Sequence, residues 1–247
     1  MTTEEGSTLR DQVDAQPIWY HTMELGPGVV TPGWFDLRPI VAQLPWPDVE
    51  GKRCLDVGTW DGFLAFEMER RGATEVVAVD IPSHADWDHL PREREQAIAE
   101  QGKIQGTKGA GFQIAAEALD SSVRREWISI YDLSPERLGT FDVVVCGSLL
   151  LHLRDPFAAL QAVRSVCSGE FMSAEQIDAR LTLMAPRRPA LFIDGRQGRW
   201  MVANSAGHRR MLEISGFDLL SVGLPYPLSC FVTAANSGAA FLTASIK

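Results

Sequence analysis

The stretch GKRCLDVGTWDGFLAFEMERRGATEVVAVD, residues 51–80, decides the fold of this chain. A short apolar run, Arg53–Val57, leads into the turn Gly58–Gly62, and an amphipathic segment then precedes a second apolar run that ends at Asp80. This order predicts a strand–turn–helix–strand unit with parallel strands. Such units bind nucleoside cofactors at the carboxyl ends of their strands, where glycines admit the ligand and an acid accepts hydrogen bonds from ribose hydroxyls. We therefore expect a cofactor site at this edge, with Asp80 on the ribose.

The spacing of the turn distinguishes two classes of cofactor. A dinucleotide-binding turn needs G-x-G-x-x-G to fit the pyrophosphate, but Trp60 stands two residues after Gly58 and disfavours a nicotinamide-dependent oxidoreductase. The pattern D-x-G-x-x-x-G instead resembles motif I of class I S-adenosylmethionine (SAM) methyltransferases. The resemblance implies a Rossmann-like α/β fold with a seven-stranded, mostly parallel sheet and a reversed C-terminal hairpin. It also implies that the motif contributes Asp56, Gly58, Thr59 and Gly62 to the cofactor site, with Asp80 and Ile81 at the next strand end.

Length and charge limit the possible functions. The 247 residues fit one α/β domain with added segments. The formal charge of −9, from 23 Lys and Arg against 32 Asp and Glu, disfavours a broad nucleic-acid surface. No apolar run reaches the length of a membrane helix. The polar start of the chain predicts no signal peptide, and the lack of C-x-x-C spacing among the four cysteines favours a reducing compartment, so we expect a cytoplasmic protein. The five histidines lack ligand-type spacing, so we expect no metal.

Apolar runs and helical patterns alternate along most of the chain, which predicts a parallel sheet. We divide the sequence into a tail and cap (residues 1–50) and a cofactor-binding domain (51–247) with insertions at 82–111 and 175–203. The insertion 82–111 is either a solvated helix with a flexible loop or a lid over the substrate. The expected strands are Arg53–Val57, Glu75–Asp80, Trp127–Ile130, Phe141–Cys146, Glu170–Ala174, Phe217–Leu224 and Ala239–Ile246, and the expected helices are Gly62–Arg71, Phe112–Leu119, Pro156–Val166 and Ser205–Ser215.

Further motifs follow the third and fourth strands. In the methyltransferase fold an acidic residue after the third strand commonly contacts the adenine, which points to Asp132 beside Tyr131; a turn aspartate is the alternative. The run FDVVVCGS resembles the family's fourth-strand motif, so Cys146 and Gly147 are expected at the methionine end of the cofactor. His152 lies just beyond it, where a histidine of near-neutral pKa can take a proton from the methyl acceptor. A structural histidine that bonds the turn is the competing interpretation.

Aromatic side chains are concentrated in the cap and the second insertion. They either shape an apolar pocket around the acceptor and the sulfonium or simply join the cap to the core. The stretches PGWFDLRP, FDVVVCGSLLLHLRDP and RWMVANSAGHRRMLEISGF, with the acid that follows the fifth strand, resemble the tRNA wobble-uridine (mo5U34 or carboxymethoxyuridine) methyltransferase subgroup. We expect Trp34 to contact the cofactor, and the substrate to meet Trp19, Tyr20, His21, Glu175 and Trp200.

The chain departs from that subgroup where the true enzymes hold the extra carboxylate of carboxy-SAM. Leu151 replaces the family tyrosine, residues 17–33 contain no lysine or arginine, and neither Ser237 nor Gly238 is basic. An unpaired buried carboxylate costs several kcal/mol, so plain SAM is the expected cofactor. The leading prediction is a SAM-dependent methyltransferase that modifies an oxygen or carbon of a small molecule. The alternatives are a tRNA wobble-uridine (carboxy)methyltransferase and a SAM-binding module without catalysis.

Overall fold

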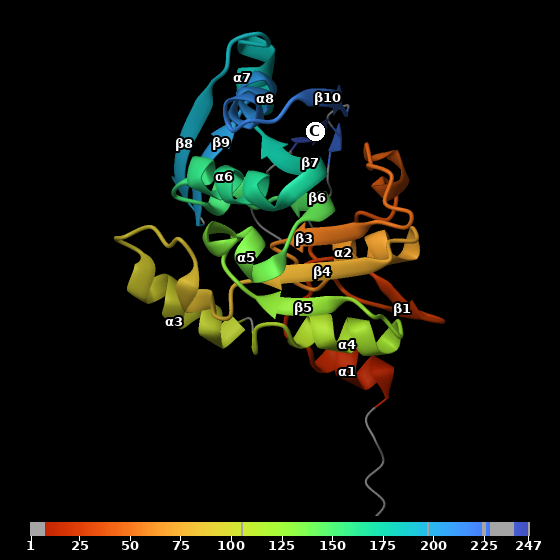
Figure 1. The fold of residues 1–247 in the computed structure, drawn as a ribbon. Helices are drawn as coiled ribbons and strands as arrows, with labels where there is room; N and C mark the ends of the chain where they lie inside the picture. The colour runs from red at the N-terminus through yellow and green to blue at the C-terminus, as the bar shows by residue number, and fades with distance from the viewer. Residues whose placement is uncertain (1–7, 105, 197, 224–225, 228–239, 247) are drawn as a thin grey trace, which may run out of the picture.

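The strand–turn–helix–strand unit expected from the sequence is present in the computed structural model as β3 (Arg53–Val57), α2 (Phe63–Arg70) and β4 (Glu75–Asp80). The two strands are parallel neighbours, in register from Arg53↔Glu75 to Val57↔Val79. The structure describes residues 8–104, 106–196, 198–223, 226–227 and 240–246. Figure 1 shows the strands as a twisted sheet with helices on both faces.

The main sheet has the strand order β10-β12-β7-β6-β3-β4-β5. Its remaining strands are β5 (Arg124–Trp127), β6 (Phe141–Gly147), β7 (Cys167–Ile177), β10 (Leu219–Val222) and β12 (Ala240–Ile246). The central pairs are parallel, whereas β12 runs antiparallel to both β7 and β10. This arrangement confirms the predicted seven-stranded, mostly parallel sheet with a reversed C-terminal hairpin.

Several predicted strand ends differ from the structure by one to three residues, and two of these differences affect the site. The third strand, expected at Trp127–Ile130, lies at Arg124–Trp127, because β5 pairs with β4 only up to Asp80↔Trp127 and the chain then enters a 3-10 turn, η3 (Ile130–Asp132). The fifth strand, expected to stop at Ala174, continues to Ile177 because β12 pairs with it over its whole second half. The second insertion therefore leaves the sheet three residues later than its expected start at Glu175.

Side chains alternate between the two faces of the sheet and create two apolar layers. Val76 and Ala78 of β4 pack with α2 and α4 (Ala110–Ala118), whereas Val77 and Val79 pack on the other face with α6 (Pro156–Val166) and α8 (Ser205–Ile214). Strands covered on both faces are expected to have apolar interiors, and in β3 and β4 the charged residues are limited to the strand ends and Asp56, next to the end of β3.

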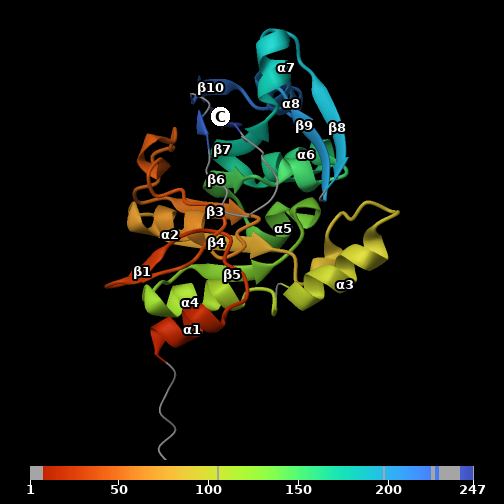
Figure 2. The same ribbon diagram turned by 180° about the vertical axis from the view of Figure 1, so that it is seen from behind.

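The outer segments are short. The cap contains α1 (Leu9–Ala15), the hairpin β1 (Glu24–Gly26) and β2 (Val29–Val30), and the 3-10 turn η1 (Val41–Gln43). The first insertion contains the turn η2 (His84–Asp86) and α3 (Arg94–Ile104), and α5 (Pro135–Leu138) and η4 (Leu150–His152) flank β6. The second insertion contains α7 (Ala179–Met184) and an antiparallel pair of strands, β8 (Leu191–Arg196) and β9 (Arg199–Ala203). The short β11 (Tyr226–Pro227) pairs with β12. Figure 2 shows α1 beside α4 and α3 on the side toward which β3 and β4 run.

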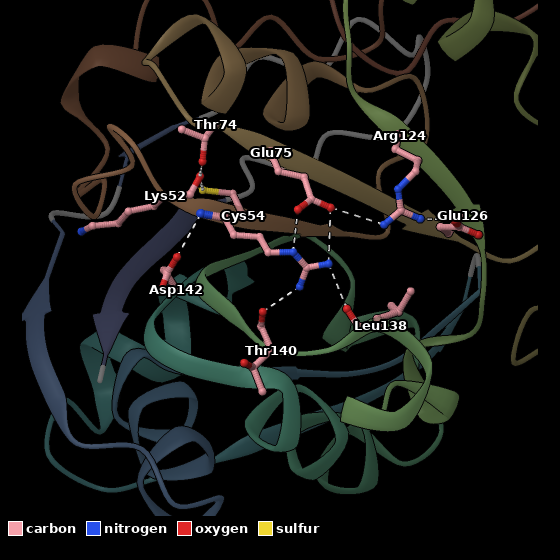
Figure 3. A network of polar contacts seen from close by, with 10 residues as sticks. Lys52, Cys54, Thr74, Glu75, Arg124, Glu126, Leu138, Thr140 and Asp142 are labelled. Atoms are coloured by element: carbon pink, nitrogen blue, oxygen red, sulfur yellow. Dashed lines mark hydrogen bonds and ion pairs between the residues drawn. The ribbon is translucent and has the colours of Figure 1, made fainter.

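At the opposite, amino-terminal end of β3, Arg53 joins three segments. Its guanidinium pairs with Glu75 at 2.7 Å, donates to the carbonyl oxygens of Thr140 (2.7 Å) and Leu138 (2.9 Å), and lies 4.1 Å from the Phe141 ring centroid. The partners of this network surround the start of β3 in Figure 3. One side chain thus connects β3, β4 and the turn that leads into β6.

Replacing this guanidinium should destabilise the fold without touching the cofactor site. We expect Arg53→Met to lower the free energy of unfolding by about 1–2 kcal/mol, because charge-assisted bonds to a carboxylate and two carbonyls are lost. Urea titration measures the change. Arg124→Met is the matched control: Arg124 is 47% exposed, and its ion pairs with Glu75 (3.5 Å) and Glu126 lie at the surface, so it should cost under about 0.5 kcal/mol. Equal losses of unfolding free energy in the two variants would contradict the stabilising role assigned to Arg53.

Three cysteines are buried free thiols, and they divide between the two apolar layers. Cys54 packs with α2, and Cys146 and Cys167 pack on the α6 face; Cys230 lies outside the described residues. Burial raises the pKa of Cys54 to about 12 and that of Cys167 to about 11.

Within the described part of the chain, no helix has both the length and the apolar character needed to cross a bilayer.

Candidate active site

A cavity of about 360 Å³ opens at the carboxyl ends of β3, β4 and β6, the edge at which the sequence predicts the cofactor. The loops that follow these strands and β5 form its floor, and the cap and both insertions supply the remaining walls. The predicted residues that line it are Tyr20, His21, Trp34, Asp56, Gly58, Thr59, Asp80, Ile81, Tyr131, Gly147 and His152. Crevices at this position are the usual ligand sites of open parallel sheets.

The loop after β3 approaches the cavity through its backbone. Gly58 has φ +78°, and its N–H and that of Thr59 donate to the Val79 carbonyl at 2.9 and 3.1 Å, which ties the loop to β4. A Cβ on Gly58 would lie 2.9 Å from Leu149 Cδ2, so a side chain here would meet both backbone strain and a clash. Gly62 lies outside the lining: it is the left-handed N-cap of α2, where Phe66 leaves no room for a Cβ.

Asp56 presents a buried carboxylate to the cavity. The residue is 1% exposed, and its Oδ2 has no hydrogen-bond partner among the described residues. Burial raises its pKa to about 6, although the Thr59 hydroxyl and the charge of His21 act in the opposite direction. A buried carboxylate with an open oxygen suits a cationic group, such as the amino group of an amino acid.

Asp80 lies where the ribose acid was predicted, but its oxygens already have partners. Oδ1 accepts the Ile81 N–H at 2.8 Å, and Oδ2 accepts the Trp60 N–H at 3.1 Å and the Lys108 ammonium at 3.0 Å. Lys108 is buried, lines the cavity, and lies 4.6 Å from the Trp60 ring centroid. Burial lowers the pKa of Lys108 while Asp80 opposes that change. The guanidinium of Arg125 adds a second cation 3.6 Å from the carboxylate.

A buried pair at the base of the cap had no signal in the sequence. His21 Nδ1 lies 2.5 Å from Asp61 Oδ1, and Asp61 Oδ2 accepts the backbone N–H groups of Tyr20 and His21 at 2.8 Å each. Asp61 therefore fixes the aromatic cap to the loop that follows β3. Its partner lies 40 residues away in sequence, so no local pattern reveals the pairing.

His152 stands at the end of η4 and faces the cavity. Its Nδ1 lies 3.0 Å from the carbonyl oxygen of Gly198 in the turn between β8 and β9. Because a carbonyl can only accept, Nδ1 carries the hydrogen and Nε2 keeps its lone pair. Burial lowers the pKa of His152 from the ordinary 6.5, so the ring is neutral at pH 7 and can accept a proton.

Trp19 and Glu175, two of the three predicted substrate residues outside the lining, are held by other contacts. Trp19 is 1% exposed in the core next to α1, and its indole donates to the Val13 carbonyl at 3.1 Å. Glu175 is 4% exposed and accepts backbone N–H groups of the η4 turn. Both side chains point into packed protein, which corrects their expected contact with a substrate.

Two predicted cofactor residues, Asp132 and Cys146, lie outside the lining, as Gly62 does. Asp132 comes after the end of β5, and its side chain is 62% exposed and 4.0 Å from Arg137. Cys146 points into the apolar layer under α6. Asp132 is displaced because β5 ends at Trp127, three residues before its predicted end. Ile128, Ser129 and Ile130 therefore reach the cavity in place of Asp132.

The insertion 82–111 forms part of the wall through Trp87, Asp88 and His89. Asp88 accepts the Tyr131 hydroxyl (2.5 Å) and the Arg154 N–H (2.8 Å) on its carboxylate, and its carbonyl accepts the indole N–H of Trp200 (2.7 Å). Trp200 thus lies outside the lining and binds the insertion instead. These contacts place the insertion over the cavity, as a lid requires; its movement stays a prediction.

The donor set at the cavity is one of carboxylates, imidazoles and aromatic rings. Among the described residues, no group of three or more His, Cys, Asp or Glu side chains is arranged to hold a metal ion. The carboxylates of Asp56 and Asp80 in the lining suit a cofactor with an amino group and a ribose, beside a neutral histidine.

Known proteins resemble the chain in both sequence and fold. The family profile for a methyltransferase domain matches residues 36–222. The ubiquinone biosynthesis O-methyltransferase of Neisseria meningitidis is 30% identical over 125 residues, 51% of this chain and 43% of that protein. The chain thus spans less than half the length of this relative.

Two solved structures share the fold. The N-terminal domain of EvdMO1, solved with S-adenosylhomocysteine and D-fucose, has a TM-score of 0.55 at 14% identity. The match covers 97% of this chain and 95% of that domain. The 1,6-didemethyltoxoflavin-N1-methyltransferase of Burkholderia thailandensis has a TM-score of 0.51 at 15% identity, and the match covers 85% of this chain and 76% of that one. Because the profile covers most of the chain, the protein belongs to the methyltransferase-domain family, the class I methyltransferases that use S-adenosylmethionine.

Proposed function

We propose that the protein transfers the methyl group of SAM to a hydroxyl oxygen of a small apolar acceptor, with His152 as the general base. The observation that carries this proposal is the neutral imidazole at the cavity, whose Nδ1 is committed to the Gly198 carbonyl and whose Nε2 is free to accept a proton. A hydroxyl acceptor needs such a base because its proton must leave as the oxygen–methyl bond forms.

The residues around the cavity fit the cofactor. The open oxygen of Asp56 suits the amino group of SAM, and Asp80 suits the ribose hydroxyls once they compete with Lys108. Gly58 brings the backbone of its loop to the cavity at a position where a side chain would clash with Leu149. When bound, SAM supplies a methyl group already activated by its sulfonium. The protein then has to hold the acceptor in line, exclude water and take the proton.

The cap determines the expected class of acceptor. Tyr20, Trp34 and Phe35 line the cavity, with Leu37 and Leu44 beside them. An aromatic and aliphatic wall favours an apolar, ring-containing molecule. The named reactions of a quinone-pathway relative and of the toxoflavin enzyme involve small molecules, which supports the same size class here.

The resemblance to the tRNA wobble-uridine subgroup gives the second candidate. Its motifs include His152 and Trp34, both of which line the cavity. The net charge of −9 opposes it. One experiment separates the candidates: incubation with trideuteromethyl-SAM and, in parallel, a metabolite extract or deproteinised tRNA, followed by mass spectrometry. Label on a small molecule supports the proposal, label on tRNA supports the second candidate, and SAM binding without label supports a non-catalytic module.

We expect SAM to bind more tightly than carboxy-SAM. Leu151 is buried and outside the cavity lining, residues 17–33 contain no lysine or arginine, and positions 237–238 lie outside the described residues. Lys108 is a buried cation at the cavity that the sequence did not reveal, but it is paired with Asp80 at the predicted ribose end. An extra carboxylate would thus lack a free partner. Calorimetric titration with both cofactors measures the difference, and tighter binding of carboxy-SAM would contradict this expectation and favour the tRNA candidate.

A further inference from the structure

Glu175 lies under the turn that carries His152. The late end of β7 places this side chain next to η4, where Oε1 accepts the N–H groups of Leu149 at 3.1 Å and Leu150 at 3.2 Å. The residue is 4% exposed, and Oε2 has no partner among the described residues. Buried amides at the start of a turn need an acceptor, and a single carboxylate oxygen provides it for both.

The same turn reaches two parts of the cavity. Leu149 packs against the Gly58 loop, and its carbonyl accepts the backbone N–H of His152 at 2.9 Å. The far end is fixed by the bond from the His152 ring to Gly198. The imidazole is therefore held from both sides, by Glu175 through the backbone of η4 and by Gly198 through the ring.

We propose that Glu175 is a positioning residue that acts on methyl transfer through His152. The proposal rests on the proposed function, because it requires His152 to be the base. A displacement of about 1 Å in a catalytic group can cost up to a hundredfold in rate. Loss of the shared acceptor leaves two buried N–H groups unsatisfied, and the turn must move to reach water or another partner. Glu175 touches neither the cavity nor the reacting atoms, so its effect travels through the turn.

Two substitutions separate the acceptor from the charge. Glu175→Gln keeps a carbonyl oxygen at the same reach and should retain kcat within about threefold. Glu175→Met keeps the length but removes the acceptor, and should lower kcat by about tenfold with little change in SAM affinity. If the methionine variant does not fold, Glu175→Asp withdraws the oxygen by one methylene and serves the same purpose.

A double-mutant cycle with His152→Ala tests the route of the effect. If Glu175 acts through His152, Glu175→Met should lower kcat in the wild-type background and have little effect once His152 is absent. An equal loss in both backgrounds, or a wild-type kcat in a folded Glu175→Met protein, would overturn the inference. Wild-type activity in His152→Ala alone would instead overturn the proposed function, so the two failures are distinct. Thermal melting of every variant checks the fold.

Discussion

His152→Ala should lower kcat by about a hundredfold or more while the dissociation constant for SAM stays near wild type. The reason is that Nε2 has a role only while the acceptor loses its proton, whereas the cofactor is held by other groups. Single-turnover rates and calorimetric titration of SAM measure the two quantities separately. Joint loss of activity and thermal stability would indicate a structural histidine, and full activity in the folded variant would exclude it from the reaction.

The pH dependence gives an independent check on His152. Only the neutral ring accepts a proton, so the rate should rise with pH as the imidazole deprotonates. Because burial lowers the pKa of His152 from 6.5, the midpoint should lie below that value, with a plateau through neutral pH. Two buried carboxyls titrate nearby, since burial raises the pKa of Asp56 to about 6 and that of Glu175 to about 7. Glu175→Gln removes one of them, and an unchanged midpoint in that variant would leave the assignment to His152 standing.

Asp80→Ala should weaken SAM binding by roughly a hundredfold, because two hydroxyl hydrogen bonds to an ionised carboxylate are lost. The substitution also leaves the buried Lys108 and Arg125 without their shared counter-ion, which could by itself disturb the site. The double variant Asp80→Ala/Lys108→Met removes the nearer of these two unpaired cations and should bind as weakly as Asp80→Ala. Calorimetry on the folded proteins provides both numbers.

Lys108→Met is the matched control for Asp80. It keeps the carboxylate and removes the ammonium that occupies Oδ2, so the ribose hydroxyls meet less competition. We expect this variant to bind SAM at least as tightly as wild type. Wild-type affinity in the Asp80→Ala/Lys108→Met double variant would show that Asp80 serves Lys108 and not the ribose.

The sequence was informative where the signal is local. The run from Asp56 to Asp80 contains its own strands, turn and carboxylates, so the fold and the side of the sheet on which the cavity lies could be predicted from it. Strand ends were less predictable, because the last residue of β5 depends on the length of β4, its neighbour in the sheet. That dependence moved Asp132 away from the cavity.

Contacts between distant segments could not be read from the chain. Lys108 meets Asp80 across 28 residues, and His21 meets Asp61 across 40. Each pairing is decided by packing of the first insertion or the cap over the sheet, for which no periodic pattern exists. Glu175 shows the same limit: its chemistry suggested a substrate contact, but the extended β7 turned it toward backbone amides.

The separation of the buried cysteines between the two apolar layers makes them chemical reporters. Alkylating reagents attack thiolates, and burial raises the pKa of Cys54 to about 12 and that of Cys146 well above its ordinary value. Both are therefore unreactive until the layer around them opens. Modification of Cys54 records exposure of the layer under α2, and modification of Cys146 or Cys167 records exposure of the layer under α6. Peptide mapping after timed alkylation would show which side of the sheet opens first as the protein unfolds.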